Sequence, residues 1–406
     1  MNMYFVLAWR NIWRNPRRSL ITMASVFFAV LLAIFMRSAT KGVYENMTDT
    51  MVRFSSGHIQ VHAKGYWDER VLDNSFVQSN GLVDNLKSVG ATSVVPRLET
   101  FALLSYGDKS RPIAIIGIDP VRESEVTGLD RKLVAGSMLS ATDQGVMLGS
   151  KLASVMKVGI GDTLVMIGQG YHGSMAASLL PVKSIVKFGS PKLDENLAYM
   201  PLKNCQTVFS ADSLLTSYSI MISNPGMVLT TNERVRELLD SNKYEVMHWK
   251  QMLPELDQLI EADSAGHYLT IYLLYLVISF GLFGTMLMMT RERLHEFGIL
   301  VAIGMKKHVL GMVVIAELFF VSLSGILSAS AVGYPLVTWL KYHPIHVGGR
   351  VGELYEGFGL EAIIPCSNDP GVIGYQALLV MTITMVLSLY PFIKIQRLQP
   401  LQAINS

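Results

Sequence analysis

Four apolar runs constrain this chain more than any other feature of its sequence. They cover residues 20–35, 268–289, 309–334 and 371–392. A helix needs about 20 apolar residues to cross the hydrocarbon core of a bilayer. The first run is shorter, but Arg37 and Lys41 can extend their charged ends from its far end to the membrane surface. The sequence therefore predicts a membrane protein with four transmembrane helices.

A polar block of roughly 230 residues separates the first two runs, which is ample for a domain of its own. Half of the 406 residues are hydrophobic and 16% are charged, too apolar for an ordinary soluble protein and too polar for one that is wholly membrane-embedded. Strand patterns at 59–61 and 113–118 alternate with helix patterns at 81–89 and 151–157. We predict a large α+β extracytoplasmic domain on a helical stalk.

Lysine and arginine placement predicts the orientation. The basic residues that flank the runs are Arg10, Arg14, Arg17 and Arg18 before the first, Arg291, Arg293, Lys306 and Lys307 between the second and third, and Lys394 and Arg397 after the fourth. The positive-inside rule puts both termini in the cytoplasm and the polar block outside. A cleaved signal peptide would also begin with basic residues and an apolar run. No small-residue cleavage site follows, so we favour an anchor.

These patterns predict the following boundaries. They are a cytoplasmic amphipathic elbow helix at 1–18, the first transmembrane helix at 19–38, a stalk helix at 39–56, the extracytoplasmic core domain at 57–248, a second stalk helix at 249–267, the second transmembrane helix at 268–290, a cytoplasmic coupling helix at 291–308, the third transmembrane helix at 309–336, an extracytoplasmic loop at 337–370, the fourth transmembrane helix at 371–393 and a cytoplasmic tail at 394–406. The elbow would lie on the membrane surface. Trp9 and Trp13 fall on one side of a helix, next to Arg10 and Arg14, and Pro16 ends that helix before the chain enters the bilayer.

The segment between the second and third runs has a pattern that a simple loop would not need. Helical spacing places Leu294, Phe297, Leu300 and Ile303 on one face, and Arg291, Arg293 and Glu296 on the other. The pattern predicts a helix that docks on a cytoplasmic partner. A solvated basic loop that only follows the positive-inside rule is the alternative.

Several short motifs resemble those of FtsX-like permeases, the membrane subunits of a class of ABC transporters. Arg291-Glu292-Arg293, Glu296-Phe297-Gly298-Ile299-Leu300 and Ala302-Ile303-Gly304-Met305 resemble the family's coupling helix, with Val301 where the family has arginine. The run from Arg10 to Asn15 resembles the family's N-terminal elbow, and Arg397, Pro400 and Ala403 resemble its closing element. The stretch 149–163 resembles part of the MacB-type periplasmic core domain, and 57–61 resembles the opening strand of lipoprotein-releasing (Lol-type) permeases.

The resemblance implies a permease of the mechanotransmission type in the bacterial inner membrane, with its large domain in the periplasm. The residues implied to contact the ATPase are Arg291, Glu292, Arg293, Glu296, Phe297, Gly298, Leu300 and Gly304. The implied partners are a separate ABC ATPase that binds ATP and Mg, a second permease copy or paralogue, and a periplasmic carrier or adaptor. The string 168–173 lacks the lysine of a phosphate-binding loop, so we expect a non-catalytic chain with no cofactor of its own.

Glu317 is an ionisable residue inside the third run, roughly 12 Å along the helix from Val309. Such a group should face another helix or a polar cavity. It either makes a structural hydrogen bond or helps to couple the cytoplasmic helix to the bundle. His58 and His62 lack a third metal ligand, Asp194 and Glu195 read as a solvated loop, and the spacing of Cys205 and Cys366 demands no disulfide.

Within the permease class, we favour release of lipoproteins from the inner membrane toward the outer membrane. The unfused layout, the large outer domain and the strand at 57–61 support this hypothesis. A small-molecule or peptide exporter and a non-transporting signal transmitter remain alternatives. The outer domain is too large for the division-type member of the family. We also predict that the 337–370 loop forms a lid over a lipid-facing cavity.

Overall fold

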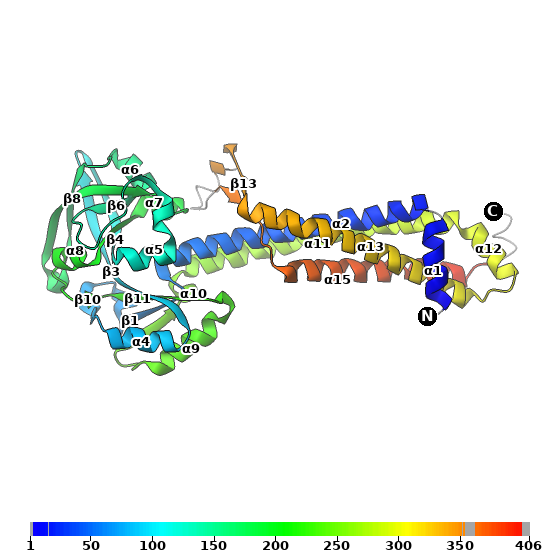
Figure 1. Ribbon diagram of the computed structural model, residues 1–406, viewed down its shortest axis with the longest axis horizontal. Helices are drawn as coiled ribbons and strands as arrows, with labels where there is room; N and C mark the ends of the chain where they lie inside the picture. Colours follow the sequence, from blue (N-terminus) through cyan, green and yellow to red (C-terminus); the bar gives the residue numbers. More distant parts are fainter. Residues whose placement is uncertain (1–2, 15, 351, 354–361, 400–406) are drawn as a thin grey trace. The chain divides into compact units, whose positions relative to one another are not determined.

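The computed structural model describes residues 3–14, 16–350, 352–353 and 362–399. The chain forms two compact units (Figure 1). The helical unit comprises residues 1–45, 260–346 and 363–406, and the head comprises 46–259 and 347–362. Much of the predicted lid, including residues 354–361, lies outside the described residues.

The helical unit contains the predicted membrane spans. Its helices are α1 (Met3–Arg14), α2 (Pro16–Met51), α11 (Pro254–Glu292), α12 (Leu294–Ala302), α13 (Lys307–Tyr342), α15 (Pro370–Leu387) and α16 (Leu389–Gln396), with α2 and α11 contributing to both units. Among the described residues, four helical segments are long and apolar enough to cross a membrane, at 19–56, 268–292, 307–342 and 370–396. The four predicted spans are therefore confirmed, and the third helix runs beyond the predicted limit of 336.

Small residues bring the spans of the helical unit together. A Cβ atom at Gly325 of α13 would lie 2.9 Å from the Val26 Cβ atom, so α2 and α13 are in close contact there. Gly281 and Gly284 of α11 differ from Gly325, since a Cβ atom at either would meet nothing within 4 Å among the described atoms.

The head is built on a mixed ten-stranded sheet within the described residues. Its strands, in spatial order, are β12 (Tyr244–His248), β1 (Ile59–Ala63), β11 (Ser217–Ile222), β3 (Ala91–Tyr106), β4 (Lys109–Ile118), β9 (Leu197–Pro201), β6 (Val146–Gly149), β8 (Met175–Val186) and β5 (Leu133–Gly136), with β7 (Thr163–Gln169) off this path. Because β7 pairs with both β3 and β8, six strands (β3, β4, β9, β6, β8 and β7) close into a ring. The hairpin from β3 to β4 turns at Gly107, whose φ of 57° suits glycine.

Side chains of the ring alternate between its inside and its outside, as a two-residue period requires. On β7, Leu164 and Met166 are fully buried in the head core, together with residues of β3, β4 and β8. Helices α6 (Ser150–Met156) and α8 (Leu202–Val208) contribute Leu152 and Cys205 to the same core. The ring and its helices confirm the predicted α+β domain.

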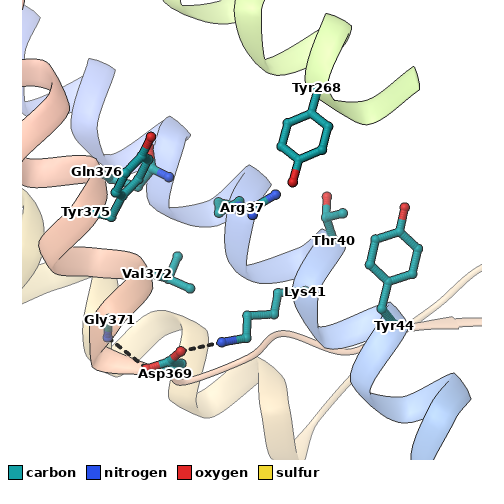
Figure 2. Close-up of a pocket in the computed structure, with 10 residues that line it drawn as sticks. All are labelled: Arg37, Thr40, Lys41, Tyr44, Tyr268, Asp369, Gly371, Val372, Tyr375 and Gln376. Atoms are coloured by element: carbon teal, nitrogen blue, oxygen red, sulfur yellow. Dashed lines mark hydrogen bonds and ion pairs between the residues drawn. The ribbon is translucent and has the colours of Figure 1, made fainter. Parts of the chain in front are cut away.

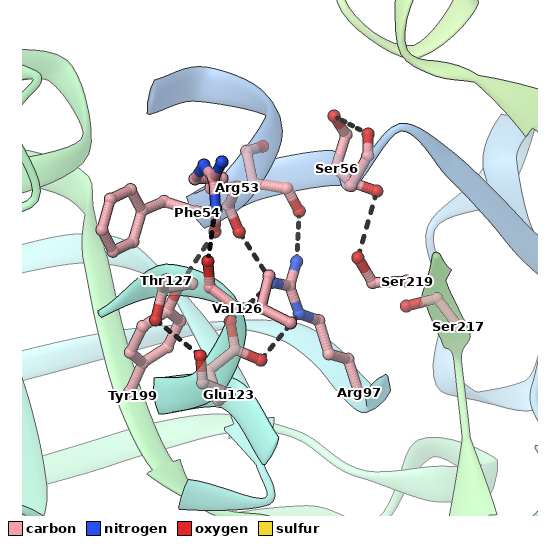
Figure 3. Close-up of polar contacts among 12 residues, drawn as sticks. Arg53, Phe54, Ser56, Arg97, Glu123, Val126, Thr127, Tyr199, Ser217 and Ser219 are labelled. Carbon is pink, nitrogen blue, oxygen red and sulfur yellow. Dashed lines mark hydrogen bonds and ion pairs between the residues drawn. The ribbon is translucent and has the colours of Figure 1, made fainter. Parts of the chain in front are cut away.

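The end of α2 is held in the head by a buried polar cluster (Figure 3). After Met51 the chain forms a π-helical turn, Val52–Ser56, whose wider hydrogen-bond pattern leaves carbonyl oxygens to be satisfied by other groups. Arg97 of β3 donates to the carbonyl oxygens of Ser55 (2.6 Å) and Arg53 (3.1 Å), and Tyr199 donates to that of Phe54 (2.9 Å).

The Arg97 guanidinium also forms two hydrogen bonds to the Glu123 carboxylate, at 2.6 and 3.2 Å (Figure 3). Glu123 lies on α5 (Pro120–Thr127), and both side chains are completely buried. Burial raises the pKa of Glu123, and the arginine opposes that shift. We call Arg97, Glu123 and the turn Val52–Ser56 the stalk-end cluster. It replaces the end of the simple stalk helix predicted for 39–56.

Other polar residues of the head are structural. His58 and His62 are buried, and desolvation lowers the pKa of His62 to about 3, so its imidazole is neutral. Asp194 was predicted to be solvated, which is wrong. It is 4% exposed and accepts a 2.6 Å hydrogen bond from the Phe188 backbone N–H. Cys205 of the head and Cys366 of the helical unit are both buried and free. Within the described residues, no three His, Cys, Asp or Glu side chains form a group that could hold a metal ion.

Candidate functional site

The predicted coupling segment folds as α12, and its first feature is an arginine that points inward. Arg293 is the N-cap of α12, 5% exposed, and its Nη1 atom lies 2.7 and 2.8 Å from the two carboxylate oxygens of Glu317 on α13. The guanidinium also lies 5.0 Å from the ring centroid of Phe297. Glu317 is 2% exposed. An ion pair therefore joins the start of α12 to the interior of α13.

This pair corrects the predicted faces of α12. Arg293 was expected on the solvated face with Arg291, but a lone buried carboxylate in α13 needs a cation, and Arg293 is within its reach. Ile303 was expected on the buried face and is 80% exposed, because α12 ends at Ala302 and Gly304 turns the chain at a φ of 108°. Phe297 is buried, as its place on the apolar face predicts, and Gly298, which the pattern did not assign to that face, is buried too.

The outward surface of α12 combines apolar and polar groups. Ile299 is 40% exposed, and its neighbours on that side of the helix, His295 and Ile303, are exposed too. Arg291 and Glu292 are exposed just before the helix, and Gly304 just after it. Leu294 and Leu300 are half-buried against a core of Met286, Met289, Leu310, Val314, Leu318, Ile395 and Leu398. The arrangement can present a mixed docking surface while its inner face is fixed by packing.

The N-terminal elbow is tied to α12 by a second ion pair. Arg14, the last residue of α1, places its Nη2 atom 2.7 Å from Glu296 Oε2. Helix α1 packs on α13 through Ala8, and the Trp9 ring lies 5.8 Å from that of Phe320. Trp9 and Trp13 remain 49% and 67% exposed, and Arg10 and Arg17 are exposed, as a membrane-surface helix requires. The Arg18 side chain lies outside the described residues.

We expect Glu296→Lys to reduce transport by about two- to fivefold, because an exposed ion pair contributes up to about 1 kcal/mol. The measurement is transport in membrane vesicles alongside co-purification of the ABC ATPase that the family resemblance implies. The matched control is the double variant Arg14→Glu with Glu296→Arg, which exchanges the two charges and so restores an ion pair between α1 and α12. A swap as defective as Glu296→Lys would show that Glu296 contacts the partner directly. Unchanged transport in Glu296→Lys would exclude both roles.

Comparison with known proteins decides the family. The model of the MacB-like periplasmic core domain matches residues 19–237, more than half of the chain, and the model of the FtsX-like permease C-terminal region matches residues 268–400. The chain belongs to the FtsX-like, MacB-type family of ABC transporter permeases. This permease is therefore a multi-pass membrane protein of a family whose members work with ABC ATPases.

Curated relatives extend over nearly all of the permease. Lipoprotein-releasing system transmembrane protein LolC of Xylella fastidiosa is 21% identical over 409 residues, 97% of this chain and 95% of the relative. LolC of Neisseria meningitidis serogroup B is 21% identical over 415 residues with the same coverage. Among solved structures, the extracellular domain of the transporter YknZ from Gram-positive bacteria (17% identity, 47% of this chain, 99% of that chain) and the periplasmic region of MacB from Actinobacillus actinomycetemcomitans (16%, 49% and 92%) each align with a TM-score of 0.33.

Two sets of contacts were not predicted from the sequence. The Arg14–Glu296 pair joins residues 282 positions apart, and no periodic pattern links them. The stalk-end cluster depends on a π-helical turn, which has no sequence signature of its own. The Arg293–Glu317 pair did have a signal, because a lone acid in an apolar span implies a cation nearby. Four basic residues, Arg291, Arg293, Lys306 and Lys307, lie between the second and third spans, so the sequence left the choice open.

Proposed function

We propose that this chain is the permease subunit of a mechanotransmission-type ABC transporter that releases lipoproteins from the inner membrane toward the outer membrane. The observation that supports it most is the alignment with LolC proteins over 97% of this chain and 95% of theirs. The head and the spans align together, so the resemblance concerns the whole layout. ATP and Mg²⁺ would bind to a separate ATPase, and both termini would lie in the cytoplasm.

The mechanism follows from the contacts of α12. Closure of the ATPase subunits pushes on the outward surface around Ile299 and Ile303. Arg293 passes the displacement to Glu317 and so to α13, because the pair is buried and cannot exchange its partners for water. The pair from Arg14 to Glu296 carries α1 with it. A second permease copy or a paralogue would complete the transporter.

The head offers a surface for a periplasmic partner. Six large apolar side chains face outward from β3, β7 and β8, namely Phe101, Leu103, Val165, Ile167, Met175 and Leu179, which are 40–83% exposed. Leu103 pairs directly with Ile167, and Val165 with Leu179. Exposed apolar patches of this kind mark protein interaction sites. In the proposed function this apolar face receives the soluble carrier that takes up the released lipoprotein.

The test is to deplete the protein, separate the inner and outer membranes, and follow lipidated proteins by mass spectrometry. We expect outer-membrane lipoproteins to accumulate in the inner membrane. Wild-type protein should restore sorting, whereas a variant with Leu103→Glu and Ile167→Glu should not. Val134→Glu on β5, which is 62% exposed outside the ring, is the matched control. Normal sorting after depletion would exclude lipoprotein release.

A second candidate is an efflux permease for a small molecule or peptide, which the match to the MacB-like domain favours. The same depletion separates the two. An efflux permease would leave lipoprotein sorting intact and would make the cells more sensitive to toxic compounds. Depletion of a signal transmitter would change neither lipoprotein sorting nor the sensitivity to toxic compounds.

A further inference from the structure

A cavity of about 420 Å³ with charged residues in its lining lies in the helical unit (Figure 2). Its walls come from α2, α11 and the start of α15. The lining residues are Arg37, Thr40, Lys41, Tyr44, Tyr268, Asp369, Gly371, Val372, Tyr375 and Gln376. The four from α2 recur at intervals of three or four residues and so share one helical face.

The cavity lining contains two cations, Arg37 and Lys41, which differ in their carboxylate partners. Lys41 is bonded to Asp369 and lies 3.7 Å from Glu45. The hydrogen bonds that Lys41 and the Gly371 backbone N–H donate lower the pKa of Asp369, which stays ionised. Arg37 contacts the Tyr268 ring at 5.9 Å, and within the described part of the chain no carboxylate lies within 4 Å of its guanidinium. Lys41 therefore has two carboxylate partners, whereas Arg37 is a cation of the lining with none among the described residues.

The position of Arg37 along α2 matches the headgroup region of a bilayer. It follows Leu20 by 17 residues, or about 26 Å of helix, close to the ~30 Å of the hydrocarbon core. Exposed apolar side chains lie further into the spans on two of the same helices, including Leu276 on α11 and Leu378 on α15. A cationic site at the surface therefore adjoins a lipid-facing apolar surface.

We propose that this cavity binds the phosphate of a membrane phospholipid, in the leaflet at the Arg37 end of the first span. The planar Arg37 guanidinium matches two phosphate oxygens, and the single negative charge of a phosphodiester pairs with the charge of Arg37, which no described carboxylate neutralises. The acyl chains lie along the exposed leucines. A free phosphate carries the same oxygens but has no chains to use that surface. The inference depends only on the spanning helices and goes beyond the proposed function.

Native mass spectrometry of the full-length protein in detergent tests the proposal, with added phosphatidylglycerol as the probe. We expect one phosphatidylglycerol molecule to be retained by the wild-type protein and to bind at least about tenfold more weakly to Arg37→Gln. Arg37→Lys should retain part of the affinity for phosphatidylglycerol, because lysine keeps the positive charge but lacks the planar guanidinium that can bind two phosphate oxygens at once. Lys341→Gln removes a cation from α13 outside the cavity and should bind as the wild type does.

Two further probes complete the test, and each lacks either the phosphate or the acyl chains of the phospholipid. Diacylglycerol, which has chains but no phosphate, should not occupy the site. Inorganic phosphate at millimolar concentration should not displace the lipid. Displacement by phosphate would assign the site to a soluble anion and overturn the lipid assignment. Equal retention of phosphatidylglycerol by the wild type, Arg37→Gln and Lys341→Gln, with all three monodisperse on size exclusion, would overturn the site itself.

Discussion

Arg293→Met is expected to lower the free energy of unfolding by about 3–5 kcal/mol, because it leaves the Glu317 carboxylate buried without its cation. Loss of transport should accompany the loss of stability. Glu317→Gln should be milder, since the amide oxygen can still accept a hydrogen bond from Arg293. The measurement is unfolding of the purified full-length chain in mixed micelles, with transport followed in vesicles.

The double variant Arg293→Met with Glu317→Met separates structure from coupling. Replacing both members of a buried ion pair by apolar residues is often neutral or stabilising. We expect the double variant to recover stability and to remain defective in transport, because the rigid connection between α12 and α13 is absent. Recovery of both stability and transport would reduce the pair to a structural role. If Arg293→Met alone were as stable as the wild-type protein, this result would contradict the buried ion pair between Arg293 and Glu317.

Arg97→Met is expected to destabilise the head by about 3–5 kcal/mol. The substitution orphans the Glu123 carboxylate and also removes the donors to the carbonyl oxygens of Arg53 and Ser55. Arg97→Lys should be nearly as harmful, because an ammonium group has three donors and cannot make the four hydrogen bonds of the planar guanidinium. Thermal unfolding and limited proteolysis of the full-length protein measure the effect, with new cleavage expected at residues 52–57.

The control is Arg97→Met combined with Glu123→Met. It removes the unpaired charge but leaves the two carbonyl oxygens without donors, at a cost of about 1–3 kcal/mol each. We therefore expect only partial recovery. Complete recovery would mean that water or a rearranged turn satisfies residues 53–56. An unchanged melting temperature for Arg97→Met would contradict the stalk-end cluster.

The sequence predicted the elements of the fold well where periodicity was strong. The helix patterns at 81–89 and 151–157 correspond to α4 (Asn80–Ser88) and α6, and the strand pattern at 113–118 lies in β4. The two helix patterns have helical spacing and are followed by Gly90 and Gly159, and the strand pattern is a continuous apolar run that ends before Asp119 and Pro120. The strand pairing could not be predicted, because closure of the ring depends on β7 meeting both β3 and β8. Nothing local in β7 specifies either partner.

The sequence predicted where the candidate site lies along the chain, but not how its side chains contact one another. Helical spacing located α12 and the buried Phe297. It misplaced Arg293, because a helical projection assigns every charge to the solvated side and ignores what a neighbouring helix requires. Ile303 was misplaced because the helix ends before it. The roles of Arg291, Glu292 and Gly304 at the ATPase stay predictions.

The closed ring of the head has a mechanical consequence. One edge of β3 is hydrogen-bonded to β11 over Ala91–Arg97 and to β7 over Ala102–Ser105, while its other edge is bonded to β4. A load applied to residues 53–56 enters at Arg97, the point where β3 exchanges one partner for the next. From there the load can pass to β4 along one edge of β3 and to β7 along the other. Because both strands belong to the same closed ring, neither strand can slide along β3 without moving the other. The ring should therefore answer a pull by moving as one rigid body, so that force at one residue becomes displacement of a whole surface.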